Sequence, residues 1–299
     1  MISVCIPLYN YNAVPLVEAL HRQCRQMAPG EVELVCIDDR STDQWRQANA
    51  AIDGMARRVL LEANIGRAAI RNLFLQYTAG QYLLFLDNDM KVGDGFLQRY
   101  ADTLADGPKV VVGGVAYNRC YNDDAHRLRY LYGTTVESRS ASERNRNPYR
   151  AFMTGNFMIE RSVLEQIRFD ESLHGYGHED TLFGYRLQQE GVPIVHIDNP
   201  AENGQVEQNA EFLDKTAEAV ANLALLYRRL GTDHGFCQSV RLLKTYERLR
   251  RYRAVWLVAA LFAVLKRPLR SHFVAGNAIT VAQFNFYKLG LLIGCLRKG

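Results

Sequence analysis

The sequence predicts an α/β fold in which a mostly parallel β-sheet is flanked by helices and followed by a C-terminal helical extension. Short apolar runs alternate with helix-like segments over about the first 90 residues, the pattern of right-handed β-α-β crossovers. Polar or acidic clusters follow three of these runs, so they should meet at one edge of the sheet. From residue 211 onward the chain is helical and basic, which predicts domains at residues 1–210 and 211–299.

The first part of the chain contains four of the expected strands. These strands cover residues 2–6, 32–37, 58–61 and 82–86, and the helices between them cover residues 14–27, a stretch ending at Gly54, and residues 67–78. In the first helix Leu16, Leu20 and Cys24 recur every fourth residue, as on one face of a helix. The fourth strand holds five consecutive large apolar residues, which is typical of a strand buried on both faces.

The rest of the predicted domain alternates less regularly. Strands are expected at residues 110–115, 151–159 and, as the last of the domain, 192–197; helices are expected at residues 93–105, 160–167 and from Gly175 to about residue 190. Residues 117–150 are polar and rich in Arg, Asn, Asp and Ser, and only residues 128–132 resemble an ordered element. A loop of this length is usually functional or mobile, so the segment is either a substrate lid or acceptor-side loop, or disordered.

Composition places the chain among globular proteins. With 299 residues, 48% apolar and 23% charged, the chain is long enough for one large domain plus an extension, and disorder is not expected. Its six cysteines are scattered without the spacing of a metal site, which favours a reduced, cytoplasmic setting. The N-terminus enters a strand at once, so no secretory signal is predicted.

The net charge of +4 conceals an acidic body and a basic tail. Residues 1–214 hold 21 Lys and Arg against 29 Asp and Glu, whereas residues 215–299 hold 15 against 3. A tail of this kind indicates an anionic partner, either a membrane surface or nucleic acid.

Two features of the tail bear on this choice. Residues 254–265 are twelve apolar residues between basic flanks, fewer than the roughly 20 of a membrane-spanning helix. Basic residues interleaved with Trp256 and Phe262 fit helices lying in a membrane interface better than they fit nucleic-acid binding. We expect residues 236–299 to bind an anionic membrane on its cytoplasmic face, with no nucleic-acid partner. The alternative is a helical pair packed on the main domain, with its Arg side chains in solvent.

Two pairs of carboxylates follow predicted strands. Asp87 and Asp89 come after the fourth strand, and on an extended chain they would point to the same side. This arrangement suits a divalent cation that bridges the protein to a diphosphate, although an acidic turn that caps a buried strand has the same sequence. Asp38 and Asp39 follow the second strand and could accept hydrogen bonds from a base or ribose, cap the next helix, or do both.

A cation and a third acidic pair complete the candidate residues. Arg71 lies one helix turn in from a helix start, where it suits a diphosphate or a base edge; an intradomain salt bridge is the more frequent role. Glu179 and Asp180 begin a predicted helix, where they either complement the helix dipole or supply a general base.

Taken together and in this order, five motifs resemble those of family 2 glycosyltransferases of the GT-A fold. They are Ser3-Val4-Cys5-Ile6-Pro7-Leu8-Tyr9-Asn10, Cys36-Ile37-Asp38-Asp39-Arg40-Ser41-Thr42-Asp43, Asn64-Ile65-Gly66 through Arg71-Asn72, Phe85-Leu86-Asp87-Asn88-Asp89, and Gly175-Tyr176-Gly177-His178-Glu179-Asp180. The resemblance covers about residues 1–200 and implies an inverting, bacterial-type enzyme that uses a nucleotide-diphospho-sugar. It implies transfer from a UDP-sugar to a hydroxyl of a saccharide or lipid-linked glycan, as in bacterial polysaccharide synthesis.

The resemblance also implies a role for each matched residue. The residues implied on the nucleotide-sugar side are Pro7, Tyr9, Asn10, Asp38, Asp39, Asn64, Gly66, Arg71, Asp87, Asn88, Gly155 and Asn156. Among them Asp39 would read the uracil edge, and Gly155 and Asn156 would line the donor sugar and acceptor. Asp180 matches the catalytic base, with Glu179 beside it.

The same resemblance implies a metal site. Asp89, together with Asp87, would hold Mn²⁺ or Mg²⁺. Many relatives have a metal-binding His several residues after the last strand, but here His196 lies within that strand and Asn203 stands where the His is expected. The third ligand is therefore His196, or Asn203, or no side chain beyond Asp89 and the diphosphate.

Two other classes of function compete with this one. A nucleotidyltransferase acting on a sugar phosphate would need a Gly-rich loop with Lys or Arg after the first strand, and residues 7–12 contain no Gly and no Lys. A non-catalytic, membrane-binding adaptor would leave the carboxylate pairs at residues 87–89 and 179–180 without a role.

Overall fold

The computed structural model describes residues 1–173, 175–231 and 233–297, and contacts divide the chain into two compact units. The first unit comprises residues 1–118, 137–173 and 182–205, and the second comprises residues 119–136, 174–181 and 206–299. The helical extension therefore shares its unit with two segments that come earlier in the chain.

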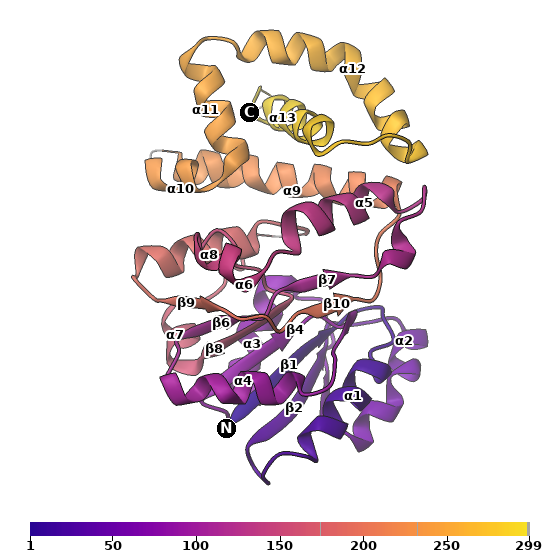
Figure 1. Ribbon diagram of the computed structural model, residues 1–299, viewed down its shortest axis with the longest axis vertical. Helices are drawn as coiled ribbons and strands as arrows, with labels where there is room; N and C mark the ends of the chain where they lie inside the picture. Colours follow the sequence, from indigo (N-terminus) through magenta and orange to yellow (C-terminus); the bar gives the residue numbers. More distant parts are fainter. Residues whose placement is uncertain (174, 232, 298–299) are drawn as a thin grey trace. The chain divides into compact units, whose positions relative to one another are not determined.

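The strands of the first unit form two sheets (Figure 1). The strands are β1 (Ile2–Leu8), β2 (Val32–Asp38), β3 (Arg57–Leu60), β4 (Tyr82–Leu86), β5 (Met90–Lys91), β6 (Val110–Val112), β7 (Val115–Tyr117), β8 (Asn156–Glu160), β9 (Ile194–His196) and β10 (Ala201–Asn203). The large sheet has the order β3-β2-β1-β4-β8-β6-β9, and the small one has the order β5-β10-β7. In the large sheet β8 is antiparallel to both of its neighbours, and the other pairs are parallel. The predicted α/β fold with a mostly parallel sheet is confirmed.

The strand order reverses beside β1. β2 lies on one side of β1 and β4 on the other, although β4 follows β2 and β3 in the chain. β1 is parallel to both neighbours, with Leu8 opposite Asp38 and Cys5 opposite Phe85. Open α/β sheets bind ligands at such a reversal, outside the carboxyl ends of the strands. The ends of β1, β2 and β4 therefore mark the candidate site.

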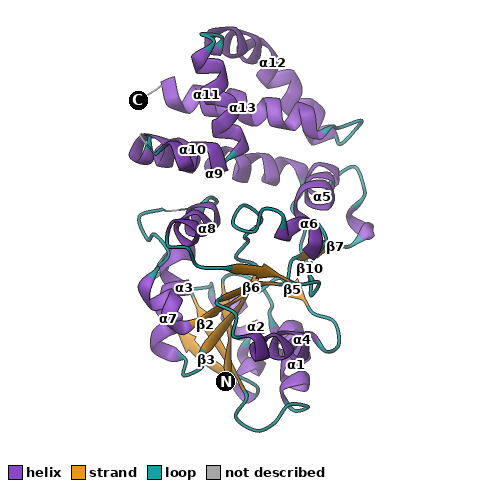
Figure 2. Ribbon diagram, turned by 60° about the vertical axis from the view of Figure 1, so that its left-hand side comes forward, coloured by secondary structure: helices purple, strands orange, loops and turns teal. Residues whose placement is uncertain are grey.

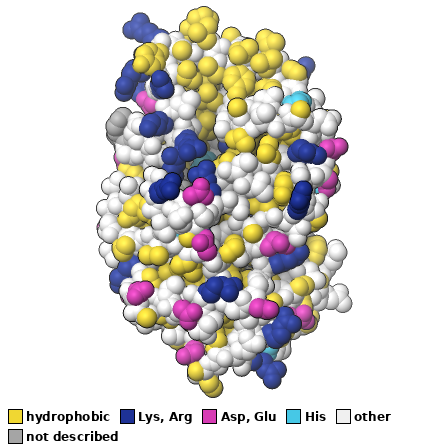
Figure 3. All heavy atoms as spheres, in the orientation of Figure 1, with side chains coloured by type: hydrophobic (Ala, Val, Ile, Leu, Met, Phe, Trp, Pro, Cys, Tyr) yellow, Lys and Arg dark blue, Asp and Glu magenta, His cyan; other side chains and the backbone are white. Residues whose placement is uncertain are grey.

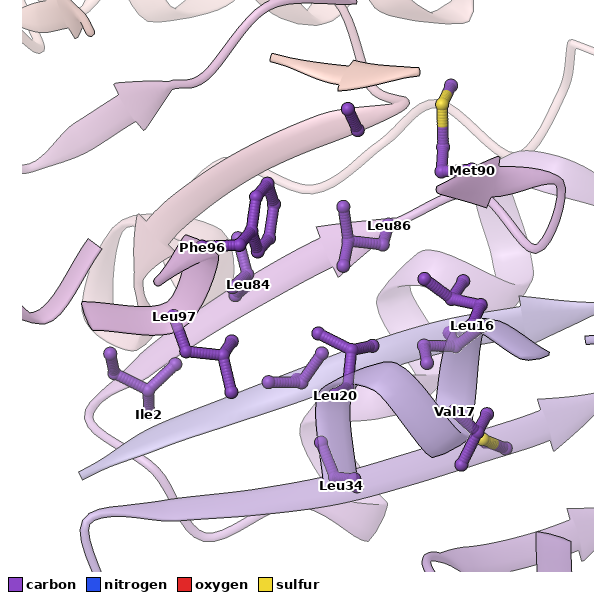
Figure 4. Close-up of a cluster of buried hydrophobic side chains, with 14 of the residues drawn as sticks. Ile2, Leu16, Val17, Leu20, Leu34, Leu84, Leu86, Met90, Phe96 and Leu97 are labelled. Carbon is purple, nitrogen blue, oxygen red and sulfur yellow. The ribbon is translucent and has the colours of Figure 1, made fainter. Parts of the chain in front are cut away.

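Helices lie on both sides of the large sheet (Figure 2). They are α1 (Val14–Cys24), α2 (Asp43–Ala48), α3 (Gly66–Tyr77), α4 (Phe96–Asp102), α6 (Ala141–Asn145), α7 (Arg161–Gln166) and α8 (Glu179–Gln189). Leu84 and Leu86 belong to a buried cluster with side chains of α1 and α4 (Figure 4), whereas Leu83 and Phe85 belong to a cluster with α3 and α7. Both faces of β4 are thus buried, which explains its uninterrupted apolar run.

Several predicted elements are shorter or divided. The helix predicted to end at Gly54 is α2 plus a 3₁₀ turn at Ala50–Gly54, and that at residues 93–105 is α4 plus a 3₁₀ turn at Thr103–Asp106. The strand predicted at residues 151–159 begins only at Asn156, and β9 is followed by β10, so it is not the last strand. Both short strands of the second sheet, β5 and β10, lack a long apolar run, which is why periodicity misses them.

The strand predicted at residues 110–115 is present in its first part as β6, and the chain then changes sheet. β6 ends at Val112 and β7 begins at Val115 in the second sheet. At Gly113 an added Cβ would lie 2.5 Å from both Asn156 Nδ2 and the Asn199 carbonyl oxygen. Only glycine fits at this close approach, so the Gly-Gly pair marks a crossing point between the two sheets.

Residues 117–150 hold more regular structure than the one ordered element predicted at residues 128–132, which is confirmed as α5, and the disordered alternative is wrong. This segment contains α5 (Arg127–Tyr132), a π-helical turn at Gly133–Glu137, and α6. Its polar side chains are partly buried in ion pairs, such as Arg129 Nε with Glu207 Oε2 at 3.1 Å within the second unit. α6 also has a capping box at its start, formed by Ser140 and Glu143. Composition misleads here because polar residues that are paired can be buried.

The second unit is a helical assembly. Besides α5 it contains α9 (Asn209–Leu230), α10 (His234–Ser239), α11 (Arg241–Arg251), α12 (Val255–Ala275) and α13 (Val281–Arg297). Phe212, Phe273, Phe284 and Tyr287 form an aromatic core between α9, α12 and α13. Of the helices in the described part of the chain, none is long and apolar enough to cross a membrane. Residues 298–299, which end the predicted membrane-binding range, lie outside the described residues.

Helix α12 continues beyond the point where the sequence predicts its end. The apolar run at residues 254–265 is closed by Lys266-Arg267-Pro268, yet the helix passes through Pro268 and ends at Ala275. A proline removes the hydrogen bond to the carbonyl four residues earlier, here that of Val264. Val264 and Pro268 both lie on the exposed side of the helix, so the Val264 carbonyl is not enclosed in the core.

Arg144 of α6 is a buried cation that joins three segments of the first unit. Its guanidinium donates to the carbonyls of Arg139, Val112, Gly113 and Ile197 at 2.8–3.1 Å. Burial lowers the pKa of Arg144, but a guanidinium stays charged in proteins. These bonds position α6 against the ends of β6 and β9.

Replacing Arg144 with Met is expected to destabilise the protein by about 3 kcal/mol or more, since several buried carbonyls lose their donors together. Arg146→Met is the matched control, because Arg146 is exposed two residues away and its loss should cost within about 0.5 kcal/mol. Urea unfolding of both variants measures the difference. Equal stabilities for the two variants would show that Arg144 does not have this structural role.

Candidate active site

Helix α3 begins beside the carboxyl end of β2, where Asp39 binds its first turn. Asp39 Oδ1 accepts the N–H of Ile65 at 2.7 Å, and Oδ2 accepts that of Gly66 at 2.9 Å. The Asn64 side chain donates back to the Asp39 carbonyl at 2.9 Å. Asp39 therefore caps α3 and not the next helix, α2, and each of its oxygens has a second lone pair for a ligand.

Arg71, in the second turn of α3, binds the carboxylate that follows β4. Its Nη2 donates to Asp87 Oδ1 at 2.9 Å, and its Nη1 donates to the Arg67 carbonyl at 3.1 Å. Arg71 is 1% exposed. Asp87 continues the alternation of β4, so its side chain lies on the same face as Phe85, towards α3. The predicted alternative of an intradomain salt bridge is present, and it fixes Asp87 at the candidate site.

Asn88 and Asp89 lie in a turn after β4. The Met90 N–H donates to the Asp87 carbonyl at 3.2 Å, which closes the turn. β4 ends at Leu86 and Asp89 lies in the turn, so the extended chain from which a shared side for Asp87 and Asp89 was predicted does not reach Asp89. Asn88 Nδ2 donates to the Tyr9 carbonyl at 3.3 Å and so connects this turn to the end of β1.

The end of β1 is bound to the loop after β2. Asn10, at φ 46°, accepts the Thr42 N–H through Oδ1 at 2.9 Å, and its own N–H donates to Ser41 Oγ at 3.0 Å. Tyr9 is 53% exposed, whereas Pro7 lies within β1, paired with a residue of β2. Tyr9 therefore offers an accessible ring at this edge of the sheet, and Asn10 has a local structural role.

Asp38 is fully buried at the end of β2. Its Oδ1 accepts the Ser41 N–H at 2.7 Å and lies 3.5 Å from Arg46 Nε. Among the described residues, Asp38 Oδ2 has no hydrogen-bond partner. A buried carboxylate oxygen without a partner costs about 1–3 kcal/mol, so a ligand hydroxyl at this oxygen would be bound favourably. No motif of the sequence includes Arg46, so it was not predicted. Its position in α2, the helix that follows Asp38, is the signal that could have suggested the contact.

The Asn156 side chain has a structural role, and the lining of the donor sugar and acceptor by the Gly155-Asn156 segment stays a prediction. Its Nδ2 donates to two main-chain carbonyls at 2.8 and 2.9 Å, and its Oδ1 accepts the Tyr100 hydroxyl at 2.7 Å. These bonds occupy the amide within the core. Gly155 does lie at the site, since its carbonyl accepts the Asp87 N–H at 3.1 Å.

His196, one of the two predicted side chains for a third metal ligand, has both ring nitrogens in hydrogen bonds. Arg144 Nη1 donates to Nδ1 at 2.8 Å, and Nε2 donates to the Pro148 carbonyl at 2.9 Å. Burial lowers the pKa of His196 to about 4, the Pro148 bond opposes this effect, and the charge of Arg144 adds to it. A metal ion could bind this ring only after one of these bonds had broken.

Asn203, the other predicted side chain, lies next to the turn that carries Asp89. It is opposite Met90 in the pairing of β10 with β5, and the following Gly204 donates its N–H to the Asp89 carbonyl at 2.7 Å. In the described part of the chain, no group of three or more His, Cys, Asp or Glu side chains is placed to hold a metal ion.

Glu179 and Asp180 begin α8, as predicted, and their turn belongs to the second unit. Asp180 Oδ1 accepts the Thr181 N–H at 2.6 Å. The loop before them is bound to α9, because Asn222 Nδ2 donates to the carbonyls of Tyr176 and Gly177 at 3.2 and 3.3 Å. An added Cβ at Gly177, where φ is 93°, would lie 2.6 Å from Ala219 Cβ, so this position requires glycine.

A comparison with models of protein families identifies the family of this chain. Residues 3–168, more than half of the chain, match the model of glycosyl transferase family 2. The chain belongs to this family. The match includes the motifs from β1 to the turn after β4, but the Glu179-Asp180 motif lies beyond it.

Curated relatives are similar over parts of their length. A validoxylamine A glucosyltransferase from Streptomyces hygroscopicus subsp. limoneus is 27% identical over 230 residues, which cover 65% of this chain and 49% of the relative. A poly(ribitol-phosphate) beta-glucosyltransferase from Bacillus spizizenii is 33% identical over 104 residues, or 33% of this chain and 16% of the relative. The chain thus spans about half the length of the first of these relatives and far less of the second.

Solved structures of the same fold are more distant in sequence. S. aureus TarS aligns with 97% of this chain and 54% of its own, with a TM-score of 0.56 and 18% identity. Glucosyl-3-phosphoglycerate synthase from Mycobacterium tuberculosis, solved with Mn²⁺, UDP-glucose and phosphoglyceric acid, aligns with 77% of this chain and 80% of its own, with a TM-score of 0.52 and 21% identity. These similarities confirm the GT-A fold.

His196 should make stability depend on pH. Its pKa is about 4 when folded and about 6.5 when unfolded, so the unfolded chain binds the proton first as pH falls. The stabilisation is present above pH 6.5 and is lost as pH falls towards 4; between pH 7 and pH 5 we expect a loss of about 2 kcal/mol. His196→Gln retains an acceptor and a donor but does not titrate, so its urea-unfolding free energy should fall less over this interval. Parallel curves for the two proteins would contradict the prediction.

Proposed function

We propose that this protein transfers a sugar from a UDP-sugar to an acceptor hydroxyl, with inversion at the anomeric carbon. The observation that carries the proposal is the set of charged residues at the carboxyl ends of β2 and β4 and on the adjoining helix α3 in a family 2 chain. This set comprises Asp38, Asp39, Arg71, Asp87 and Asp89. Ligands of open α/β sheets bind at this edge.

The donor's nucleoside would lie over the ends of β1 and β2. The accessible ring of Tyr9 would stack on the uracil. The uracil edge would donate to Asp39, whose carboxylate oxygens each have a second lone pair besides the one that accepts an amide at the start of α3. A ribose hydroxyl would donate to Asp38 Oδ2. Arg71 would act mainly by holding Asp87, whose second oxygen then faces the sugar side.

A single displacement accounts for the chemistry. Asp180 accepts the proton of the acceptor hydroxyl while the hydroxyl oxygen bonds to the anomeric carbon. The bond from that carbon to the UDP oxygen breaks, and its electron pair stays with the diphosphate. Attack from the opposite face inverts the anomeric configuration. Glu179 would support Asp180 by its position beside it at the start of α8.

Mn²⁺ or Mg²⁺ is the proposed cofactor. Asp89 would be its main protein ligand, since Arg71 already binds Asp87 Oδ1. Asn203 is opposite Met90, the residue after Asp89, in the pairing of β10 with β5. Its amide oxygen also accepts the Gln205 N–H at 3.0 Å. A sparse donor set suits a cation held largely by substrate phosphates. When bound, the cation would neutralise charge on the leaving diphosphate.

The proposed acceptor is a hydroxyl of a saccharide or lipid-linked glycan, at the inner face of the cytoplasmic membrane. Support comes from the basic charge of residues 215–299 and from the polymer named for the poly(ribitol-phosphate) relative. A screen of UDP-sugars for UDP release in the presence of Mn²⁺ tests the proposed activity. Neither turnover nor thermal stabilisation by any UDP-sugar would overturn it and favour a non-catalytic adaptor.

Replacing Asp180 with Asn is expected to lower kcat for sugar transfer by about 100-fold or more, because an amide cannot accept the hydroxyl proton. Calorimetric titration of UDP should give an unchanged Kd, since the nucleotide would bind at the ends of β1 and β2. Near-wild-type transfer by this variant, with UDP binding intact, would refute the assignment of Asp180 as the base.

Replacing Asp89 with Ala should weaken UDP binding about tenfold or more when Mn²⁺ is present, because losing even a residue that supports a metal ligand lowers metal affinity about this much. Without Mn²⁺, the variant and the wild type should bind UDP equally. Asp94→Ala is the matched control, since Asp94 is an exposed acid a few residues further on. Equal Mn²⁺ dependence in all three proteins would eliminate Asp89 as the metal ligand.

A further inference from the structure

Helix α12 has two apolar faces, and its charged residues lie in its second half. One face carries Phe262 and Phe273, which are buried against Tyr287 of α13. The opposite face carries large apolar side chains at helical spacing that contact no other element closely enough to be buried. They are Trp256, Leu257, Leu261, Val264 and Val274, which are 44–74% exposed. We name these five residues the outer face of α12.

A contiguous exposed apolar surface of this kind usually marks an interaction site. Hydrophobic side chains gather over α12 at the top of Figure 3, with basic side chains beside them towards α11. The first half of the helix, Val255 to Leu265, contains no charged residue. A helix packed on a domain with solvated arginines on its outer side, the alternative expected from the sequence, would instead carry charges at these positions.

Basic residues lie at both ends of this uncharged segment. Arg251 and Arg253 precede it, and Lys266 and Arg267 follow it; all four are exposed. The segment spans 11 residues, or about 16 Å of helix. Cations at both ends of an apolar helix would reach the phosphate level of a bilayer if the helix lay flat in the interface.

A shallow, largely open depression adjoins the outer face and is lined by Arg267, Arg270, Ser271, Val274 and Ala275, all of α12. It combines two guanidinium groups and a hydroxyl with two small apolar side chains. This lining suits the phosphate of a lipid headgroup together with the first part of its acyl region. Arg270 also pairs with Asp214 at 2.9 Å, which fixes its position.

From these observations we propose that the outer face of α12 inserts into the interface of an anionic lipid bilayer. The proposal deepens the membrane location proposed above by naming the contact surface. A second copy of the chain fits less well: residues 215–299 have 15 basic and 3 acidic residues, so two identical faces would repel each other. An anionic surface complements this charge.

Sedimentation with lipid vesicles tests the proposal without any turnover. Vesicles of phosphatidylcholine with phosphatidylglycerol should bind the protein about tenfold or more tightly than vesicles of phosphatidylcholine alone. Raising salt from about 0.05 M to about 0.5 M should weaken the binding. No binding to the anionic vesicles at low salt overturns the proposal, whereas vesicle binding without UDP release overturns only the proposed activity.

Two variants locate the contact. Leu261→Glu combined with Val264→Glu should lower vesicle binding about tenfold or more, because two charges would enter the apolar layer. Leu225→Glu is the control, since Leu225 is also exposed in the second unit but lies on α9. Equal vesicle binding by the wild type and the double variant would overturn the assignment to α12.

Fluorescence gives a readout that leaves the outer face intact. The chain has two tryptophans, so Trp45→Phe leaves Trp256 as the single emitter. Its emission should shift to shorter wavelength when anionic vesicles are added and stay constant with neutral ones. Unchanged emission with anionic vesicles overturns the proposal. Concentration-dependent dimers without vesicle binding would also overturn it, by assigning the face to a second copy.

Discussion

The candidate site depends on helix α3 being held by two carboxylates. Asp39 binds the amides of its first turn, and Arg71 in its second turn binds Asp87. One helix thereby fixes the end of β2 relative to the end of β4. Arg71 is buried in this ion pair and Asp87 is partly exposed, so the pair holds the end of β4 against α3 while one side of the carboxylate stays open to solvent. The nucleotide of the proposed donor would meet groups that are already in place, which is the condition for strong electrostatic recognition.

The fold could be predicted where periodicity and burial agree. β4 was predictable as a buried strand because both of its faces are covered and its residues are therefore all apolar. The helices that cover it were predictable from their regular apolar spacing. Prediction fails at the second sheet, since β5 and β10 are too short to show a period. It also misses α6 within residues 117–150, where Arg144 is buried because its guanidinium is paired. Composition cannot distinguish a paired buried arginine from one in solvent.

The site was predictable as a set of residues but not as a set of contacts. The order of motifs places Asp39, Arg71 and Asp87 at one edge, yet nothing in that order shows that Asp39 caps α3. Asn156 belongs to the same stretch as Gly155 but points into the core, because β8 runs between β4 and β6 and brings Asn156 close to Tyr100. Such roles depend on which strands become neighbours, and sequence spacing alone does not determine this.

The chain alternates between the two units, so a single cut cannot separate them. The loop before Asp180 is part of this interleaving: it is held by Asn222 of α9 and packs so closely that Gly177 cannot carry a side chain. A protein shortened to residues 1–210 would lose nearly all of α9 and with it the amide that binds this loop. Asp180, the proposed base, would then follow a loop that has lost its hydrogen bonds to Asn222. The helical extension therefore supports the loop that carries the proposed base, so substitutions in α9 that remove the Asn222 amide would act on this loop as well as on the packing of the helices.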